Sequence, residues 1–209
     1  MRSHYVHQLE ELEELLGKMG GLILRGFADA KSALATGSAE SIKDAANVER
    51  RTDVKTEEIE RLCSLLLLTQ QPVASDMRFI VSVMNIVVDM ERIGDQVRDI
   101  SETAGKCATE RALPEIISMT ADCEDMIRGA LDAFIGRDTE LAAKVIARDD
   151  VVDEAFDKLK KHLTDRAGRG KNTDDLLDLL MIGKYLERIG DHATNIAEWT
   201  RYVVDGVRK

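Results

Sequence analysis

The chain has 209 residues, of which 44% are hydrophobic and 33% charged, so it carries enough apolar material for one or two compact units. Its formal net charge is −10 and its basic residues form no stripe, which excludes nucleic acid as an expected partner. The N-terminal segment has no apolar signal-like core, and the richest apolar run, Leu65 to Leu68, is too short to span a bilayer. We therefore expect a cytoplasmic protein without membrane insertion.

The residue types favour helix throughout. Only two prolines and 4% aromatic residues occur among many Leu, Ala, Glu, Lys, Arg and Met residues, which lose little rotamer freedom in a helix. The three cysteines are odd in number and lack metal-type spacing, which indicates a reducing compartment rather than a disulfide framework. The sequence predicts an all-α protein.

Helical periodicity divides the chain into six segments. Gly37 and Ser38 can end the first helix and cap the second, Pro72 interrupts the next pair, Ser75 or Asp76 can cap the third helix, and Gly206 can close the last. The predicted helices cover about 4–35, 39–69, 75–107, 114–135, 141–167 and 173–205.

An internal duplication organises these helices. The segment LRGFADA at 24–30 matches IRGALDA at 127–133, and ERIGD at 91–95 recurs at 187–191. Each half then holds three antiparallel helices, so we predict two tandem three-helix bundles, 1–109 and 110–209. Three glycines in the first helix (Gly17, Gly20 and Gly21) each weaken it by about 0.5–1 kcal/mol relative to alanine, which would permit a break there.

Acidic residues recur at four-residue spacing, which places both members of a pair on one helix face. The pairs are Glu49 and Asp53, Glu91 and Asp95, Asp149 and Asp153, and Glu187 and Asp191. Asp99 lies four residues after Asp95 and extends the acidic row of the third helix, and Asn195 stands at the corresponding position of the sixth.

Distances along the chain place these pairs level in two helical hairpins. Asp53 and Glu91 are equally far from Pro72 on its two sides, and so are Glu49 and Asp95. In the second hairpin, Asp153 and Glu187 are equally far from Gly170, and so are Asp149 and Asp191. Opposed carboxylates repel one another strongly where solvent is thin, so such a cluster requires cations.

Oxygen ligands of this kind suit hard ions such as magnesium, manganese or ferric iron, with zinc as a further candidate. Gly94 and Gly190 lie between the acids on the same face, where a missing side chain would leave room for ions. His192 points about 100° away from Asp191 around the helix and is not expected to be a ligand.

Three segments resemble the PhoU family of phosphate-transport accessory proteins and phosphate-signalling regulators: QQPVASDMRFI from Gln70, DMERIGD from Asp89 and LLMIGKYLERIGDHATNIAEW from Leu179. The resemblance implies tandem three-helix bundles with multinuclear metal clusters on acidic motifs. Those motifs fall on Glu49, Asp53, Glu91, Asp95, Asp99, Asp149, Asp153, Glu187, Asp191 and Asn195. Asn195 departs from the all-acid pattern because an amide brings no charge.

The resemblance also implies a role and partners. Such a protein acts between the phosphate-specific ABC transporter, including its ATPase subunit, and a membrane sensor histidine kinase, and holds phosphate-starvation signalling off. Homodimerisation and the choice between the two partners remain open.

The sequence also bears on three other functions: a di-iron oxidase, a metal-free adaptor and a phosphoester hydrolase. A carboxylate-bridged di-iron oxidase would need Glu-x-x-His on two helices, and the sequence has no such motif. A metal-free helical adaptor with solvated acids remains an alternative. No nucleophile or phosphate-cradling glycine loop stands out, so we do not expect an enzyme; metal-dependent phosphoester hydrolysis is the weaker alternative.

Overall fold

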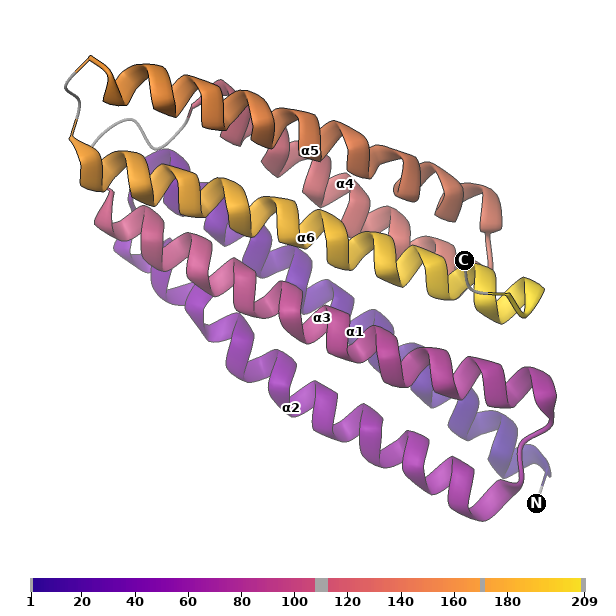
Figure 1. Cartoon of the computed structure of the whole chain (residues 1–209). Helices are drawn as coiled ribbons and strands as arrows, with labels where there is room; N and C mark the ends of the chain where they lie inside the picture. The colour runs from indigo at the N-terminus through magenta and orange to yellow at the C-terminus, as the bar shows by residue number, and fades with distance from the viewer. Residues whose placement is uncertain (1, 108–112, 170–171, 208–209) are drawn as a thin grey trace.

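The computed structural model describes residues 2–107, 113–169 and 172–207, with side chains described from His4 onward. Within these ranges the chain forms six helices and no strand, in agreement with the predicted all-α class (Figure 1). The helices are α1 (Arg2–Thr36), α2 (Ala39–Gln70), α3 (Ala74–Lys106), α4 (Pro114–Gly136), α5 (Thr139–Ala167) and α6 (Thr173–Asp205).

The helix ends follow the predicted signals except at the start of α3. Gly37 and Gly206 take positive φ angles of 68° and 76°, and the Ser38 side chain accepts a hydrogen bond from the next helix. The prediction that Ser75 or Asp76 caps α3 is wrong, because Val73 is the N-cap residue and has no side-chain capping bond. The backbone N–H of residue 77 already donates to the Val73 carbonyl oxygen at 2.8 Å, so the two polar residues lie inside the first turn.

Helix α1 runs without a break through its glycines. A Cβ atom on Gly20 would lie 2.5 Å from Leu131 Cδ1, so this glycine allows α1 to approach α4 closely. Contact with neighbouring helices stabilises α1 along its length, which offsets the low helix propensity of its glycines.

The six helices pack as two groups of three. Helices α1, α2 and α3 contact one another, as do α4, α5 and α6, and the groups join through α3 with α6 and α1 with α4 (Figure 1). Helices α3 and α6 run in opposite directions along their shared contact. The predicted boundary between residues 109 and 110 lies outside the described residues.

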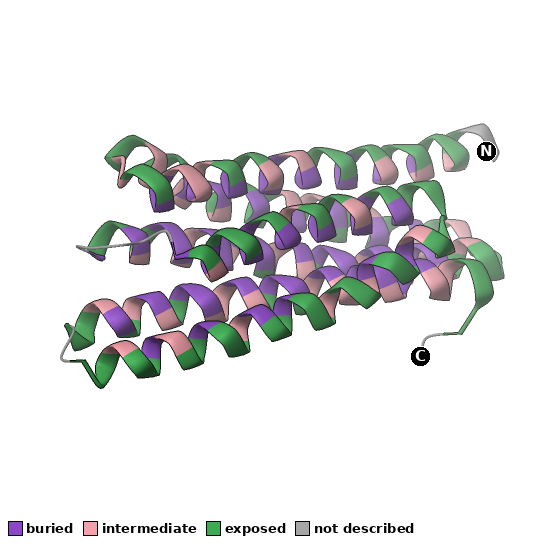
Figure 2. Ribbon diagram, turned by 90° about the horizontal axis from the view of Figure 1, so that it is seen from above, coloured by how far each residue is buried: buried purple, intermediate pink, exposed green. Residues whose placement is uncertain are grey.

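One apolar core extends through both groups, and the buried faces of the helices point toward one another (Figure 2). Phe79 of α3 stacks on Phe134 of α4 with ring centroids 5.8 Å apart, so aromatic packing crosses between the halves. All three cysteines are buried and free, and burial raises the pKa of Cys63 to about 12. No described helix is long and apolar enough to cross a membrane.

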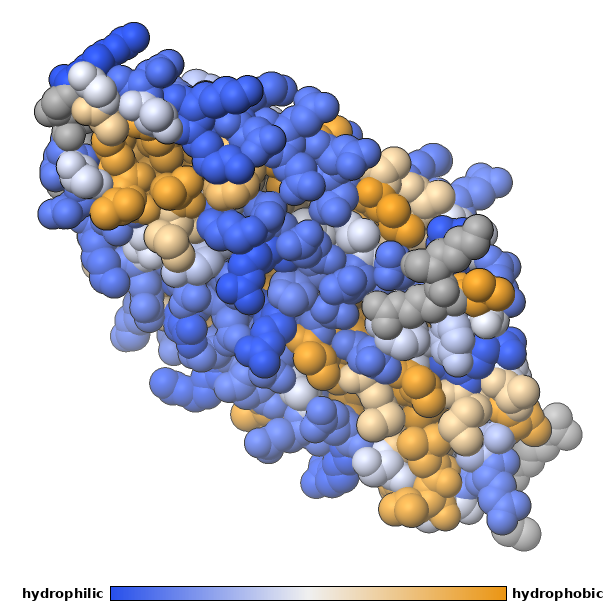
Figure 3. Space-filling view, in the orientation of Figure 1, coloured by the Kyte–Doolittle hydropathy of each residue, from blue (hydrophilic) through white to orange (hydrophobic). Residues whose placement is uncertain are grey.

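Hydrophilic residues dominate the middle of the face shown in Figure 3, and apolar residues gather near its two ends. At the α2–α3 turn, the exposed apolar residues are Leu65, Leu68, Val73 and Met77. The acidic residues singled out in the sequence belong to the helices α2, α3, α5 and α6 that form this face.

Candidate functional site

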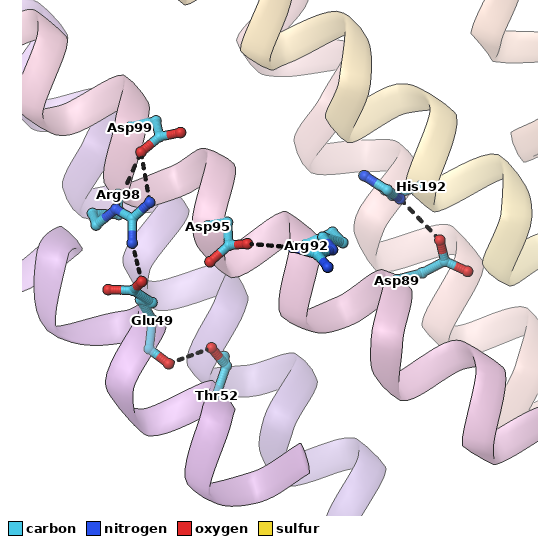
Figure 4. Close-up of polar contacts among 8 residues, drawn as sticks. All are labelled: Glu49, Thr52, Asp89, Arg92, Asp95, Arg98, Asp99 and His192. Atoms are coloured by element: carbon cyan, nitrogen blue, oxygen red, sulfur yellow. Dashed lines mark hydrogen bonds and ion pairs between the residues drawn. The ribbon is translucent and has the colours of Figure 1, made fainter.

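In the first half, Arg98 links the acids of α2 and α3. Its guanidinium pairs with the Glu49 carboxylate on α2 and donates to Asp99 Oδ1 at 2.9 Å on its own helix (Figure 4). Both acids are partly exposed, with 32% of the Glu49 side-chain surface and 28% of the Asp99 side-chain surface open to solvent. A basic side chain therefore already neutralises this end of the acidic face.

Asp53 of α2 and Glu91 of α3 lie close enough for the charge of Asp53 to affect the Glu91 carboxyl. Burial raises the pKa of the Glu91 carboxyl, and the negative charges of Asp53 and Asp95 raise it further. Arg92 acts in the opposite direction and also pairs with Asp95 at 3.2 Å (Figure 4). Asp53 itself is exposed, so its charge is partly screened by water.

The two ERIGD glycines show that the halves are not equivalent. A Cβ atom on Gly94 would lie 2.7 Å from the Thr52 hydroxyl oxygen, whereas one on Gly190 would lie 3.1 Å from Asp149 Oδ1. Thr52 and Asp149 thus occupy matching positions, so Glu49 and Asp53 of the first half do not stand over the glycine as Asp149 does in the second. Each glycine allows the preceding helix to approach closely instead of leaving open room for ions, and only in the second half is the group above it a carboxylate.

The second half holds the denser acidic face. Burial raises the pKa of Asp149 to about 6, and the charges of Asp191 and Asp153 add to the effect. Burial and then Glu187 raise the pKa values of both Asp153 and Asp191. The level pairs predicted from the chain distances therefore approach one another here. Lys184 pairs with Glu187 on the same helix and supplies part of the compensating charge.

Asn195 lies at the contact between the two halves. Its amide Nδ2 donates to Asp89 Oδ1 of α3 at 3.1 Å. His192 Nδ1 lies 2.9 Å from the same oxygen, as Figure 4 shows. Asp99, its counterpart on α3, raises the pKa of Tyr185 on α6, after the larger effect of burial. These two predicted ligands therefore face the partner half, and sequence reasoning did not single out Asp89 or Arg98.

The donor atoms fit a hard cation better in the second half than in the first. Carboxylates whose pKa values are raised by one another gain most from a cation placed among them. Within 2–107, 113–169 and 172–207, however, no group of three or more His, Cys, Asp or Glu side chains is arranged so that it could hold a metal ion. Metal binding would require carboxylates to rotate toward one another, with Asp149, Asp153, Glu187 and Asp191 as the ligands.

The two groups of three helices join along α3 and α6 and carry paired carboxylates on their outer hairpins. These features define a class of all-helical bundle proteins with acidic faces. The comparisons identify the family within this class. A family model for the PhoU domain matches residues 16–104 and again 116–200, so the chain belongs to the PhoU family.

Known proteins match this chain in sequence and in structure along nearly its full length. The phosphate-specific transport system accessory protein PhoU homolog of Synechocystis is 33% identical over 211 residues, covering 100% of this chain and 94% of that protein. The crystal structure of PhoU from Pseudomonas aeruginosa superposes with a TM-score of 0.92 at 29% identity, covering 97% of this chain and 100% of that one. The phosphate transport system regulatory protein PhoU from Streptococcus pneumoniae gives a TM-score of 0.91 at 26% identity, covering 98% and 99%.

Proposed function

We propose that this protein is an accessory protein of a phosphate-specific transport system and a negative regulator of phosphate-starvation signalling. The observation that carries the proposal is the full-length match to relatives named as accessory proteins of that system. The all-helical architecture supports action by protein–protein contact, because it presents long helix faces to partners. The proposed partners are the ATPase subunit of the phosphate ABC transporter and a membrane sensor histidine kinase.

Deleting the gene in its host tests the regulatory role. Expression of a phosphate-starvation reporter should then rise in phosphate-rich medium, and a copy of the intact gene should restore repression. A reporter that stays repressed after deletion would contradict the regulatory role. Co-purification with the transporter ATPase or with the kinase then decides which partner is bound directly.

The acidic faces are proposed to bind metal ions, with iron, zinc, manganese or magnesium as candidates and more than one ion at each face. The raised pKa values of Asp149, Asp153 and Asp191 support this assignment, because they arise from burial and from the neighbouring carboxylates, which Lys184 compensates only in part. A bound cation would supply that charge and fix the distance between α5 and α6. The two faces would not be identical, since Thr52 replaces a carboxylate in the first half.

Elemental analysis after purification without chelator tests metal binding. We expect metal in the wild-type protein, less after Asp149→Asn with Asp191→Asn, and a smaller loss after Glu91→Ala with Asp95→Ala. Asp165→Asn, an exposed change on the same α5 helix, is the matched control and should leave the metal content unchanged. A wild-type protein without metal after incubation with each candidate ion would contradict the assignment.

A metal-free adaptor is the second candidate, and the basic residues favour it in the first half. Arg98 pairs with Glu49 and Asp99, and Arg92 pairs with Asp95, so three of the five predicted ligands there already have cationic partners. The same elemental analysis separates the two candidates, because a metal-free adaptor would carry no metal either before or after the acids are neutralised.

A further inference from the structure

A groove between α1 and α2 lies apart from the acidic faces, and basic residues outnumber acidic ones in its lining. Two hollows of about 470 and 640 Å³ follow these helices, and both are lined by Leu22, Arg25 and Arg51. They therefore form one continuous groove, and their volumes lie in the range of sites for small organic ligands.

The arginines of this groove have no partner within the described part of the chain. Arg25, Arg50 and Arg51 are exposed, and none of them forms an ion pair or hydrogen bond with another described residue. Lys18 and Lys55, at one end of the groove, pair with Glu14 and with Glu58. A cluster of uncompensated guanidinium groups in a protein of net charge −10 indicates a site for an anion.

Two helix glycines leave the wall of the groove open. A Cβ atom on Gly17 would meet nothing within 4 Å, and one on Gly21 would meet only the Arg25 guanidinium at 3.5 Å. Glycine inside a helix is destabilising, so packing usually explains it, as it does at Gly26, where a Cβ atom would lie 2.1 Å from Val48. Packing within the fold does not require glycine at positions 17 and 21. A ligand lying against α1 would require it, because a side chain there would occupy the ligand's space.

The duplicated half provides an internal comparison. Aligning Gly26 with Gly129 places Thr120 and Glu124 at the positions of Gly17 and Gly21. There Glu124 pairs with Arg128, the counterpart of Arg25, at 3.6 Å, and the hollow between α4 and α5 is only about 150 Å³. The open glycines and the unpaired arginine occur together on α1, whereas the aligned positions of α4 carry neither.

The other end of the groove is acidic. Asp29 of α1 and Asp44 of α2 line the first hollow with Asn47, one to two helical turns from the arginines. Burial raises the pKa of Asp29, and the charge of Asp44 raises it further. A plain polyanion would be repelled here, whereas a ligand that donates hydrogen bonds from the end opposite its anionic group would fit.

We propose that the α1–α2 groove binds a small organic phosphate of mononucleotide size, with its phosphate on Arg25 and Arg51 and its hydrogen-bond-donating end at Asp29 and Asp44. The nucleotide base or ribose supplies the donors at the acidic end. Gly17 and Gly21 give the ligand access to the surface of α1. This site is independent of the proposed regulatory role and of metal at the acidic faces.

Binding is measured by calorimetry with ADP as the probe and EDTA in the buffer, so that metal on the acidic faces cannot bridge to phosphate. We expect saturable ADP binding, with adenosine and orthophosphate each at least about tenfold weaker because each occupies one end only. Arg25→Gln and Arg51→Gln should each weaken ADP about tenfold or more, and Arg128→Gln, the counterpart in α4, should leave it unchanged.

The variants Gly17→Leu and Gly21→Leu test whether ADP binding can be blocked without loss of stability. Each should abolish ADP binding while the melting temperature stays the same or rises, because leucine favours helix and a Cβ atom meets nothing at Gly17 and only the flexible Arg25 side chain at Gly21. The proposal is overturned if ADP does not bind at millimolar concentration, if adenosine or orthophosphate binds as tightly as ADP, or if the arginine and glycine variants bind ADP like the wild type.

Discussion

Asp149 offers a direct test of the charge arrangement on the second acidic face. Its pKa is raised from 3.8 to about 6, so the folded protein favours the protonated acid more than the unfolded chain does. The resulting stabilisation is fully present below about pH 4 and is lost as the pH rises through about 6. Two pKa units correspond to roughly 3 kcal/mol for a buried group, and screening at this half-exposed position reduces the figure to about 1 kcal/mol.

Asp149→Asn should therefore stabilise the metal-free protein at about pH 7.5 by about 1 kcal/mol, or roughly 2–4 °C in melting temperature, and should have little effect at about pH 4. Thermal unfolding in EDTA at both pH values measures this, with Asp165→Asn as the control. With metal bound, the sign should reverse, because the substitution removes a ligand. A loss of stability at the higher pH in EDTA, or an equal gain at both pH values, would refute the reasoning.

Three further predictions concern packing and polar contacts. Gly26→Ala should destabilise the protein by about 1–3 kcal/mol in urea unfolding because of the clash with Val48, whereas Gly17→Ala should stabilise it by about 0.5–1 kcal/mol; equal effects would contradict the packing described. Asp89→Asn should cost about 1–2 kcal/mol by weakening the contacts with its two partners on α6, and a neutral result would show that these contacts contribute nothing. The buried cysteines should not react with a thiol reagent at about pH 8 until the protein is denatured, and fast labelling of the native protein would contradict their burial.

The sequence was sufficient to predict the helices and which acids approach one another across the second hairpin. Both depend on local rules, since capping residues mark helix ends and a rise of about 1.5 Å per residue fixes which positions face each other across a turn. Asp153 and Glu187 are equally far from Gly170 along the chain, and burial and then the charge of Glu187 raise the pKa of the Asp153 carboxyl group.

The rotation of each helix about its own axis was not predictable in the same way. Four-residue spacing places two acids on one face but does not say which face packs against the neighbouring helix. Thr52, rather than Glu49 or Asp53, lies over Gly94, because the apolar residues of α2 decide which side is buried. The contacts of Asp89 across the halves depend on tertiary packing and left no local signal in the sequence.

The continuous core has a consequence for the origin of the chain. Because α3 and α6 bury apolar surface against each other, one copy of the repeat on its own would expose that surface to water. A single-copy ancestor would have needed a second identical molecule to cover it, and the opposed directions of α3 and α6 match a two-fold symmetric pair. Joined in one chain, the two halves are free to differ, and one carries open glycines on α1 while the other carries the denser carboxylates.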